Sequence, residues 1–133
     1  MARVAIDSIG EVKAVVEAHE ALVRAGDLDG ILGNFADDGV LLAPNVPLVQ
    51  GKQALRELYA QLLGMGTWDF VHEYDGAEVV GDFVVLHGVA RGTLSPPGGQ
   101  TSTFTNNFIH MWRKDTDGRY RLWRGAFAPA ANG

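Results

Sequence analysis

The sequence predicts an α+β fold in which three N-terminal helices pack on a curved, mostly antiparallel sheet of five or six strands. Before Gly66, apolar residues recur at helical spacing in three segments separated by Gly, Asp and Pro. After Gly66, most of the chain is strand-like and is divided by Asp-Gly turn signals. The length of 133 residues suits a single domain over residues 1–133. Because long strands bent around helices leave a concave interior, we expect this domain to enclose a ligand pocket.

The first helix is predicted from about Asp7 to Arg24, and it carries the first candidate functional residue. Its apolar residues follow the i, i+3, i+4 spacing of an amphipathic helix and comprise Ile9, Val12, Val15, Val16, Leu22 and Val23. His19 occupies the gap in this apolar stripe, so it is expected to face the interior. A buried histidine is either a hydrogen-bonded core residue or part of a binding or catalytic site.

Turn signals predict the next three elements. Gly26 is a typical helix stop and Asp27 a typical N-cap, while Asp37-Asp38-Gly39 is expected to turn the chain into a strand that ends before Pro44. The predicted elements are a second helix over Leu28–Phe35, a strand over Val40–Ala43 and a third helix over Gly51–Leu63.

The second half of the chain predicts the remaining strands. They cover Trp68–Tyr74, Ala77–Val80, Phe83–Leu94, Thr101–Arg113 and Arg119–Phe127. Asp75-Gly76 is read as the turn between the first two of them. Alternation along the fourth strand places one set of side chains on a common face, namely Phe104, Asn106, Phe108, His110 and Trp112.

Composition excludes several kinds of site. The chain has no Cys, which rules out disulfides and thiolate chemistry, and its net charge of -5 argues against a nucleic-acid surface. No apolar run approaches the roughly 20 residues that span a bilayer, and Met1–Gly10 lacks a signal-peptide core. No histidine pair has the spacing of a zinc site. We therefore expect a cytoplasmic protein without a metal, and without nucleic-acid or membrane partners.

Three segments carry a family resemblance, namely Ala25–Gly30 (AGDLDG), Phe35–Val40 (FADDGV) and Gly51–Leu55 (GKQAL). With the closing Trp112-Arg113, Asp117–Arg119 and Trp123–Phe127 segments, the chain resembles the nuclear transport factor 2-like superfamily. Within it, the chain is most similar to the ketosteroid isomerase and SnoaL-like polyketide cyclase branch. The resemblance implies a cone-shaped fold, often a homodimer through the outer sheet face. It leaves the chemistry open, because this fold hosts isomerases, dehydratases, cyclases, epoxide hydrolases and binding proteins.

The catalytic pattern of that branch is matched only in part. Ketosteroid isomerases use a carboxylate base, with a tyrosine and a protonated aspartic acid that hold the enolate oxygen. The base position, directly before Pro44, is occupied by Ala43, which cannot accept a proton. The resemblance places His19 and His110 at the two oxyanion positions and Tyr59 at a supporting tyrosine.

The resemblance thus implies an enzyme that acts on a hydrophobic carbonyl compound by isomerisation, cyclisation or dehydration. His19 would be a general acid or base, His110 its partner or the oxyanion donor, and Tyr59 an orienting donor, and no cofactor is implied. The expected ligand-binding residues are mostly aromatic and comprise Phe35, Phe108, Trp112, Trp123, Phe127 and Asn106. The alternatives are a pocket that binds a hydrophobic ligand without chemistry, and a domain that only drives oligomerisation.

Other titratable residues are weaker candidates. Asp69, Glu73 and Asp75 could supply a base. A pocket role for Asp69 and Glu73 requires that Phe70 face outward, because alternation places them on the opposite face from Phe70. His72 and His87 have no matching partners in the sequence, and we expect them to be structural or exposed.

Overall fold

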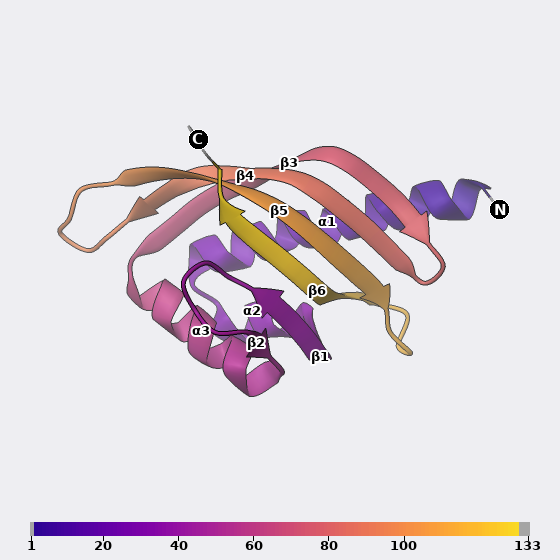
Figure 1. Ribbon diagram of the computed structural model, residues 1–133, viewed down its shortest axis with the longest axis horizontal. Helices are drawn as coiled ribbons and strands as arrows, with labels where there is room; N and C mark the ends of the chain where they lie inside the picture. The colour runs from indigo at the N-terminus through magenta and orange to yellow at the C-terminus, as the bar shows by residue number, and fades with distance from the viewer. Residues whose placement is uncertain (1, 131–133) are drawn as a thin grey trace.

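A computed structural model of the chain describes residues 2–130, with side chains from residue 8 onward, and confirms the predicted α+β class (Figure 1). The elements are α1 (Ala2–Ala25), α2 (Leu28–Gly33), β1 (Phe35–Leu42), β2 (Val49–Gln50), α3 (Lys52–Gly64), β3 (Thr67–Val80), β4 (Phe83–Ser95), β5 (Ser102–Lys114) and β6 (Tyr120–Pro129). The six strands form one sheet in the order β2-β1-β6-β5-β4-β3. Neighbouring strands are antiparallel except for β1 and β6, which are parallel.

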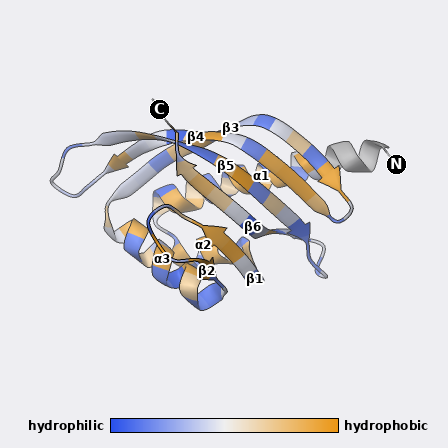
Figure 2. Cartoon of the chain, viewed as in Figure 1, coloured by the Kyte–Doolittle hydropathy of each residue, from blue (hydrophilic) through white to orange (hydrophobic). Residues whose placement is uncertain are grey.

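The three helices lie against one side of the curled sheet. α1 runs along β3 and β4, while α2 and α3 pack near β1 and β2 (Figure 1). Hydrophobic and hydrophilic residues alternate along α3 and along the strands, as expected for elements with one buried face (Figure 2). The largest fully buried side chains come from both layers and comprise Trp112, Phe35, Ile31, Leu55, Leu86, Val12, Val16 and Val84. Within residues 2–130, no helix is both long and apolar enough to cross a membrane.

The second helix is shorter than predicted, because the chain enters the sheet earlier. α2 ends at Gly33, and the backbone N–H of Asn34 closes it by donating to the carbonyl oxygen of Ile31 at 3.1 Å. The carbonyl of Asn34 accepts the N–H of Leu122 at 2.8 Å, and Phe35 is paired with Leu122 on β6. The prediction that Phe35 belongs to the helix was therefore wrong.

Two predicted turns are irregularities within continuous strands. Asp37-Asp38-Gly39 lies inside β1, where the pairing with β6 shifts register between Phe35 and Val40. Likewise, Asp75-Gly76 lies inside β3, where the pairing with β4 shifts between Tyr74 and Gly76. A bulge bends a strand without ending it, so both predicted turns were wrong and β3 is one long strand.

Candidate functional site

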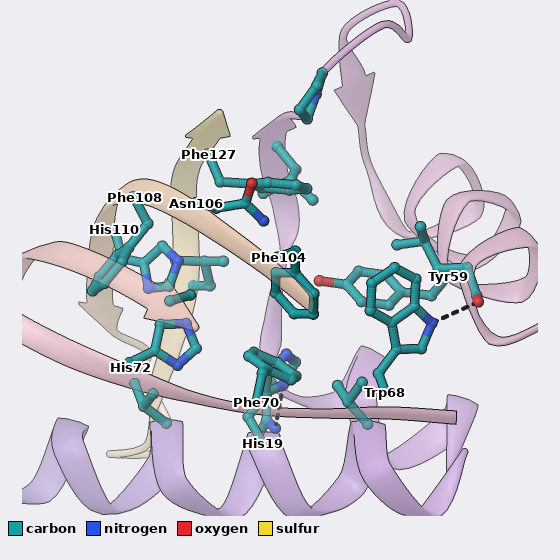
Figure 3. Close-up of a pocket in the computed structure, with 18 of the residues that line it drawn as sticks. His19, Tyr59, Trp68, Phe70, His72, Phe104, Asn106, Phe108, His110 and Phe127 are labelled. Carbon is teal, nitrogen blue, oxygen red and sulfur yellow. Dashed lines mark hydrogen bonds between the residues drawn. The ribbon is translucent and has the colours of Figure 1, made fainter. Parts of the chain in front are cut away.

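A cavity of about 530 Å³ opens between the helices and the sheet (Figure 3). This volume lies in the range of pockets that hold drug-sized molecules. Its wall is largely aromatic, with side chains from β1, α3, β3, β5 and β6 that include Phe35, Tyr59, Trp68, Phe70, Phe104, Phe108, Trp112 and Phe127. A flat hydrophobic ligand would find extensive contact area in such a cavity.

The cavity has an exposed rim and a buried interior. Three lining residues, Asn45, Met65 and Pro129, are exposed and come from separate chain segments. In contrast, Phe35 and Trp112 are almost fully buried. A ligand that enters past the rim therefore meets an apolar interior that also holds a few polar side chains.

His19 presents a hydrogen-bond donor to this cavity. Burial, reinforced by the nearby His72, lowers the pKa of His19 to about 4, so the ring is neutral at pH 7. Nδ1 lies 3.1 Å from the side-chain nitrogen of Asn34, which donates to it. The ring proton is thus on Nε2, and no hydrogen bond to the described residues occupies that atom.

Tyr59 supplies a second donor from α3. Its ring meets that of His19 edge-on, with centroids 6.3 Å apart. The hydroxyl points into the cavity (Figure 3), and within residues 8–130 it has no hydrogen-bond partner. Burial raises the pKa of Tyr59, so the hydroxyl keeps its proton and can donate it to a ligand.

His110 lies on β5 between two aromatic residues of the same face. Its ring centroid is 4.6 Å from that of Phe108 and 6.0 Å from that of Trp112. Burial, together with His72 and His19, lowers the pKa of His110 well below its usual value. Nδ1 of His110 and Nε1 of Trp112 are buried without a partner among the described residues. Each unmade hydrogen bond costs about 1–3 kcal/mol, and a role in catalysis or binding is one explanation for such a group.

His72 also lines the cavity, although its sequence context did not place it among the expected site residues. Its side chain is only 7% exposed, and its Nδ1 lies 2.7 Å from a carboxylate oxygen of Glu20 on α1. His72 is therefore not exposed, and its partner Glu20 was not expected from the sequence. Its alternation with Trp68 and Phe70 was the available signal, because all three side chains share the inner face of β3. His87 lies on the outer face of β4 and is exposed.

Trp123 was predicted to line the pocket, and this prediction was wrong. Its indole N–H donates to Asp38 at 3.2 Å, and the guanidinium of Arg124 lies 3.9 Å from the ring centroid. The pairing of β5 with β6 shifts register at this point, so Trp112 is paired with Leu122 and Met111 with Arg124. Trp123 is the extra residue of this bulge, and Leu122 takes the place on the inner face.

The structure gathers the other predicted residues in the one cavity, namely His19, His110, Tyr59, Phe35, Phe108, Trp112, Phe127 and Asn106. The alternative bases do not join them. Asp69 and Glu73 lie on the outer face of β3, where exposed ion pairs hold them to Arg24 at 3.0 Å and to Arg91 at 2.9 Å. Among the described side chains, no three His, Asp or Glu residues are arranged to hold a metal ion.

Several solved structures share this fold across nearly the whole chain. A ketosteroid isomerase-like protein from Erwinia carotovora is 20% identical, with 93% of this chain and 95% of that chain covered and a TM-score of 0.79. An NTF2-like superfamily protein from Salmonella enterica is 16% identical, with 97% and 96% covered and a TM-score of 0.80.

A third structure, from Xanthomonas campestris, is described as a candidate calcium/calmodulin-dependent protein kinase II association domain. It is 20% identical, with 92% of this chain and 88% of that chain covered and a TM-score of 0.83. At these identities the similarity shows the fold alone. No curated protein matches the sequence.

The family is shown by the sequence itself. The profile of the SnoaL-like domain matches residues 15–123, a span that includes the second half of α1, all of α2 and α3, and most of the sheet. This chain therefore belongs to the SnoaL-like domain family of the NTF2-like superfamily.

Proposed function

We propose that this protein is a small-molecule enzyme that performs acid–base chemistry, without a cofactor, on a flat hydrophobic carbonyl compound. The observation that carries the proposal is the pair of neutral donors in an apolar cavity, Nε2–H of His19 and the hydroxyl of Tyr59. Neither donor is used by another described residue. Both are therefore free to bind one acceptor on a ligand, such as a carbonyl oxygen.

Such a pair favours chemistry next to a carbonyl group. When a proton leaves the neighbouring carbon, negative charge develops on the carbonyl oxygen, and donors already in place stabilise it. The apolar surroundings strengthen this effect, because the local dielectric constant is low. The reaction would be an isomerisation, cyclisation or dehydration, with His110 as a further donor or as the proton-transfer partner of His19.

A simple ketone tests this proposal. β-Tetralone is flat and hydrophobic, and exchange of its α-protons in D₂O can be followed by NMR. We expect the protein to accelerate the exchange, and His19→Phe to abolish the acceleration while the circular dichroism spectrum is retained. His87→Phe, on the outer face of β4, is the matched control. If His19→Phe accelerates the exchange as the wild type does, the assignment of His19 is wrong.

A second candidate function is binding of a hydrophobic ligand without chemistry. The observation that favours it is Ala43, which stands before Pro44 and offers no proton acceptor. A binding protein would show saturable shifts of the cavity resonances with β-tetralone and no accelerated exchange.

A further inference from the structure

We propose that Glu20 and His72 form the proton-transfer dyad of the cavity, with Nε2 of His72 as the general base and Glu20 as its positioning residue. This inference rests on the proposed function, and it supplies the proton acceptor that Ala43 cannot provide. The two residues come from α1 and β3, on the side of the cavity next to His110.

The contacts of Glu20 set the orientation of the His72 ring. Glu20 is only 8% exposed, and a single carboxylate oxygen accepts two hydrogen bonds from His72. One comes from the backbone N–H at 2.8 Å and the other from Nδ1 at 2.7 Å. Because a carboxylate only accepts, Nδ1 carries the proton of the neutral ring. Nε2 then holds a lone pair.

The ring that carries this lone pair is part of the cavity wall. The ring of His72 lines the cavity, with its centroid 4.8 Å from Phe108 and 5.4 Å from His110. No hydrogen bond to the described residues occupies Nε2. His19 has the opposite tautomer, so the cavity holds an acceptor on His72 and a donor on His19. Figure 3 shows His72 and His110 on one side of the cavity and Tyr59 on the other.

This arrangement fits the two halves of an enolisation. The C–H bond next to the carbonyl breaks, its proton moves to Nε2 of His72, and its electron pair forms the enolate. The enolate oxygen is then bound by His19 and Tyr59, while the new imidazolium is paired with the Glu20 carboxylate. Return of the proton to another carbon completes an isomerisation, and atoms and charge balance.

The dyad also has a separate route to solvent. Glu20 and His72 border a second, more polar hollow on the outer side of α1 and β3, which Lys13, Glu17, Arg24 and Tyr74 also line. In the imidazolium, the Nδ1 proton of His72 is hydrogen-bonded to Glu20, so it can pass through that carboxylate to water on this side without crossing the apolar cavity. Proton release would not require the ligand to leave.

Several ionisable groups face His72 and set its proton affinity. Burial lowers the pKa of His72, and the hydrogen bond and charge of Glu20 oppose that effect. His19 on α1 and His110 on β5 are neutral at pH 7, because their pKa values are also lowered. Replacing Glu20 with Gln removes the negative partner of the imidazolium. The midpoint of the pH–rate profile should therefore move to lower pH, and the plateau rate should fall.

The test uses exchange of the α-protons of β-tetralone in the full-length protein. We expect His72→Gln, which can still donate to Glu20, to reduce the exchange rate by about 100-fold or more. Glu20→Gln should give a smaller loss together with the shifted pH profile. Glu78 is an exposed glutamate on the outer face of β3. The matched control Glu78→Gln should change neither the exchange rate nor the pH profile.

A second measurement does not depend on turnover. In ¹⁵N-histidine NMR spectra, His72 should show the Nδ1–H tautomer and His19 the Nε2–H tautomer. An Nε2–H tautomer for His72, or exchange in His72→Gln at the wild-type rate, would overturn the dyad. If the wild type itself does not accelerate exchange, the proposed function fails and the dyad fails with it. If exchange depends on His19 and not on His72, only the dyad is wrong.

Discussion

The side-chain amide of Asn34 lies 3.1 Å from Nδ1 of His19 and thereby determines which nitrogen of that ring faces the ligand. Asn34 is buried at the end of α2, and its backbone is held at both ends, by Ile31 and by Leu122. The junction of α2 with the sheet therefore fixes the backbone position from which the amide reaches His19. The orientation of His19 depends on this junction as well as on α1.

Introducing a negative charge at position 34 should change the protonation of His19. In Asn34→Asp, a carboxylate replaces the amide beside Nδ1 and favours the imidazolium, so we expect the pKa of His19 to rise well above about 4. A histidine NMR titration would measure it. Asn107→Asp, on the outer face of β5, is the control and should leave the His19 titration unchanged. An unaltered His19 pKa in Asn34→Asp would show that the hydrogen bond does not persist in solution.

The buried histidines predict how stability depends on pH. The folded-state pKa of His19 is about 4 and lies below its unfolded value of 6.5, so between these pH values the unfolded chain binds more protons. The free energy of unfolding should therefore fall as pH drops through this window, by at most about 1.4 kcal/mol per pH unit from His19 alone. Urea unfolding at several pH values would measure the slope. His19→Phe should make it shallower, and an equal slope in that variant would contradict the assignment.

Asp38 affects the stability of the protein at lower pH than the buried histidines do. The guanidinium of Arg113, with the indole N–H of Trp123, lowers the pKa of Asp38 to about 2. Its contribution to stability is therefore present above the unfolded value of 3.8 and is lost as pH falls toward 2. Asp38→Asn should reduce the loss of stability below pH 4 and leave the slope between pH 4 and 6.5 unchanged. A changed slope in the upper window would mean that Asp38 is coupled to the histidines.

Two tryptophans should differ in their contribution to stability. Trp112 is 2% exposed in the core, so Trp112→Ala should lower the free energy of unfolding by about 3–5 kcal/mol. Trp112→Phe should cost much less, because it also removes the unpartnered indole N–H. Trp123→Ala should cost less than Trp112→Ala, since Trp123 packs on surface arginines. Equal losses for the two alanine variants in urea unfolding would contradict the outward placement of Trp123.

The outer face of the sheet is where we expect a homodimer to form. Val71 on β3 and Ile109 and Met111 on β5 are apolar residues on this face, and Ile109 is 48% exposed. A charge at this position would have to be desolvated in the interface, so Ile109→Lys should shift the protein toward the monomer. Light scattering coupled to gel filtration would report the mass. Gln61→Lys on α3 is the control, and a monomeric wild type would refute the prediction.

Local periodicity was sufficient to predict which side chains face inward wherever a helix or strand is regular. The 3.6-residue repeat of α1 predicted that His19 faces inward, and the two-residue repeat predicted the shared face of Phe108 and His110 on β5. The inward placement of Trp123 came from the family resemblance, and it failed because the bulge in the pairing of β5 with β6 reverses the alternation at this residue. The partner of His72 could not be predicted, because Glu20 is 52 residues away in the chain and only the packing of α1 on β3 brings the two together.

The position of β6 has a consequence for how the chain folds. The last strand of the sheet lies in its interior, between β5 and the parallel strand β1. The antiparallel ribbon of β3, β4 and β5 can form from contacts close in sequence, whereas β1 gains its central neighbour only when β6 arrives. Contacts of such high sequence separation slow folding, because the chain loses entropy before they form. During synthesis, the ligand cavity can therefore be completed only after β6 has left the ribosome.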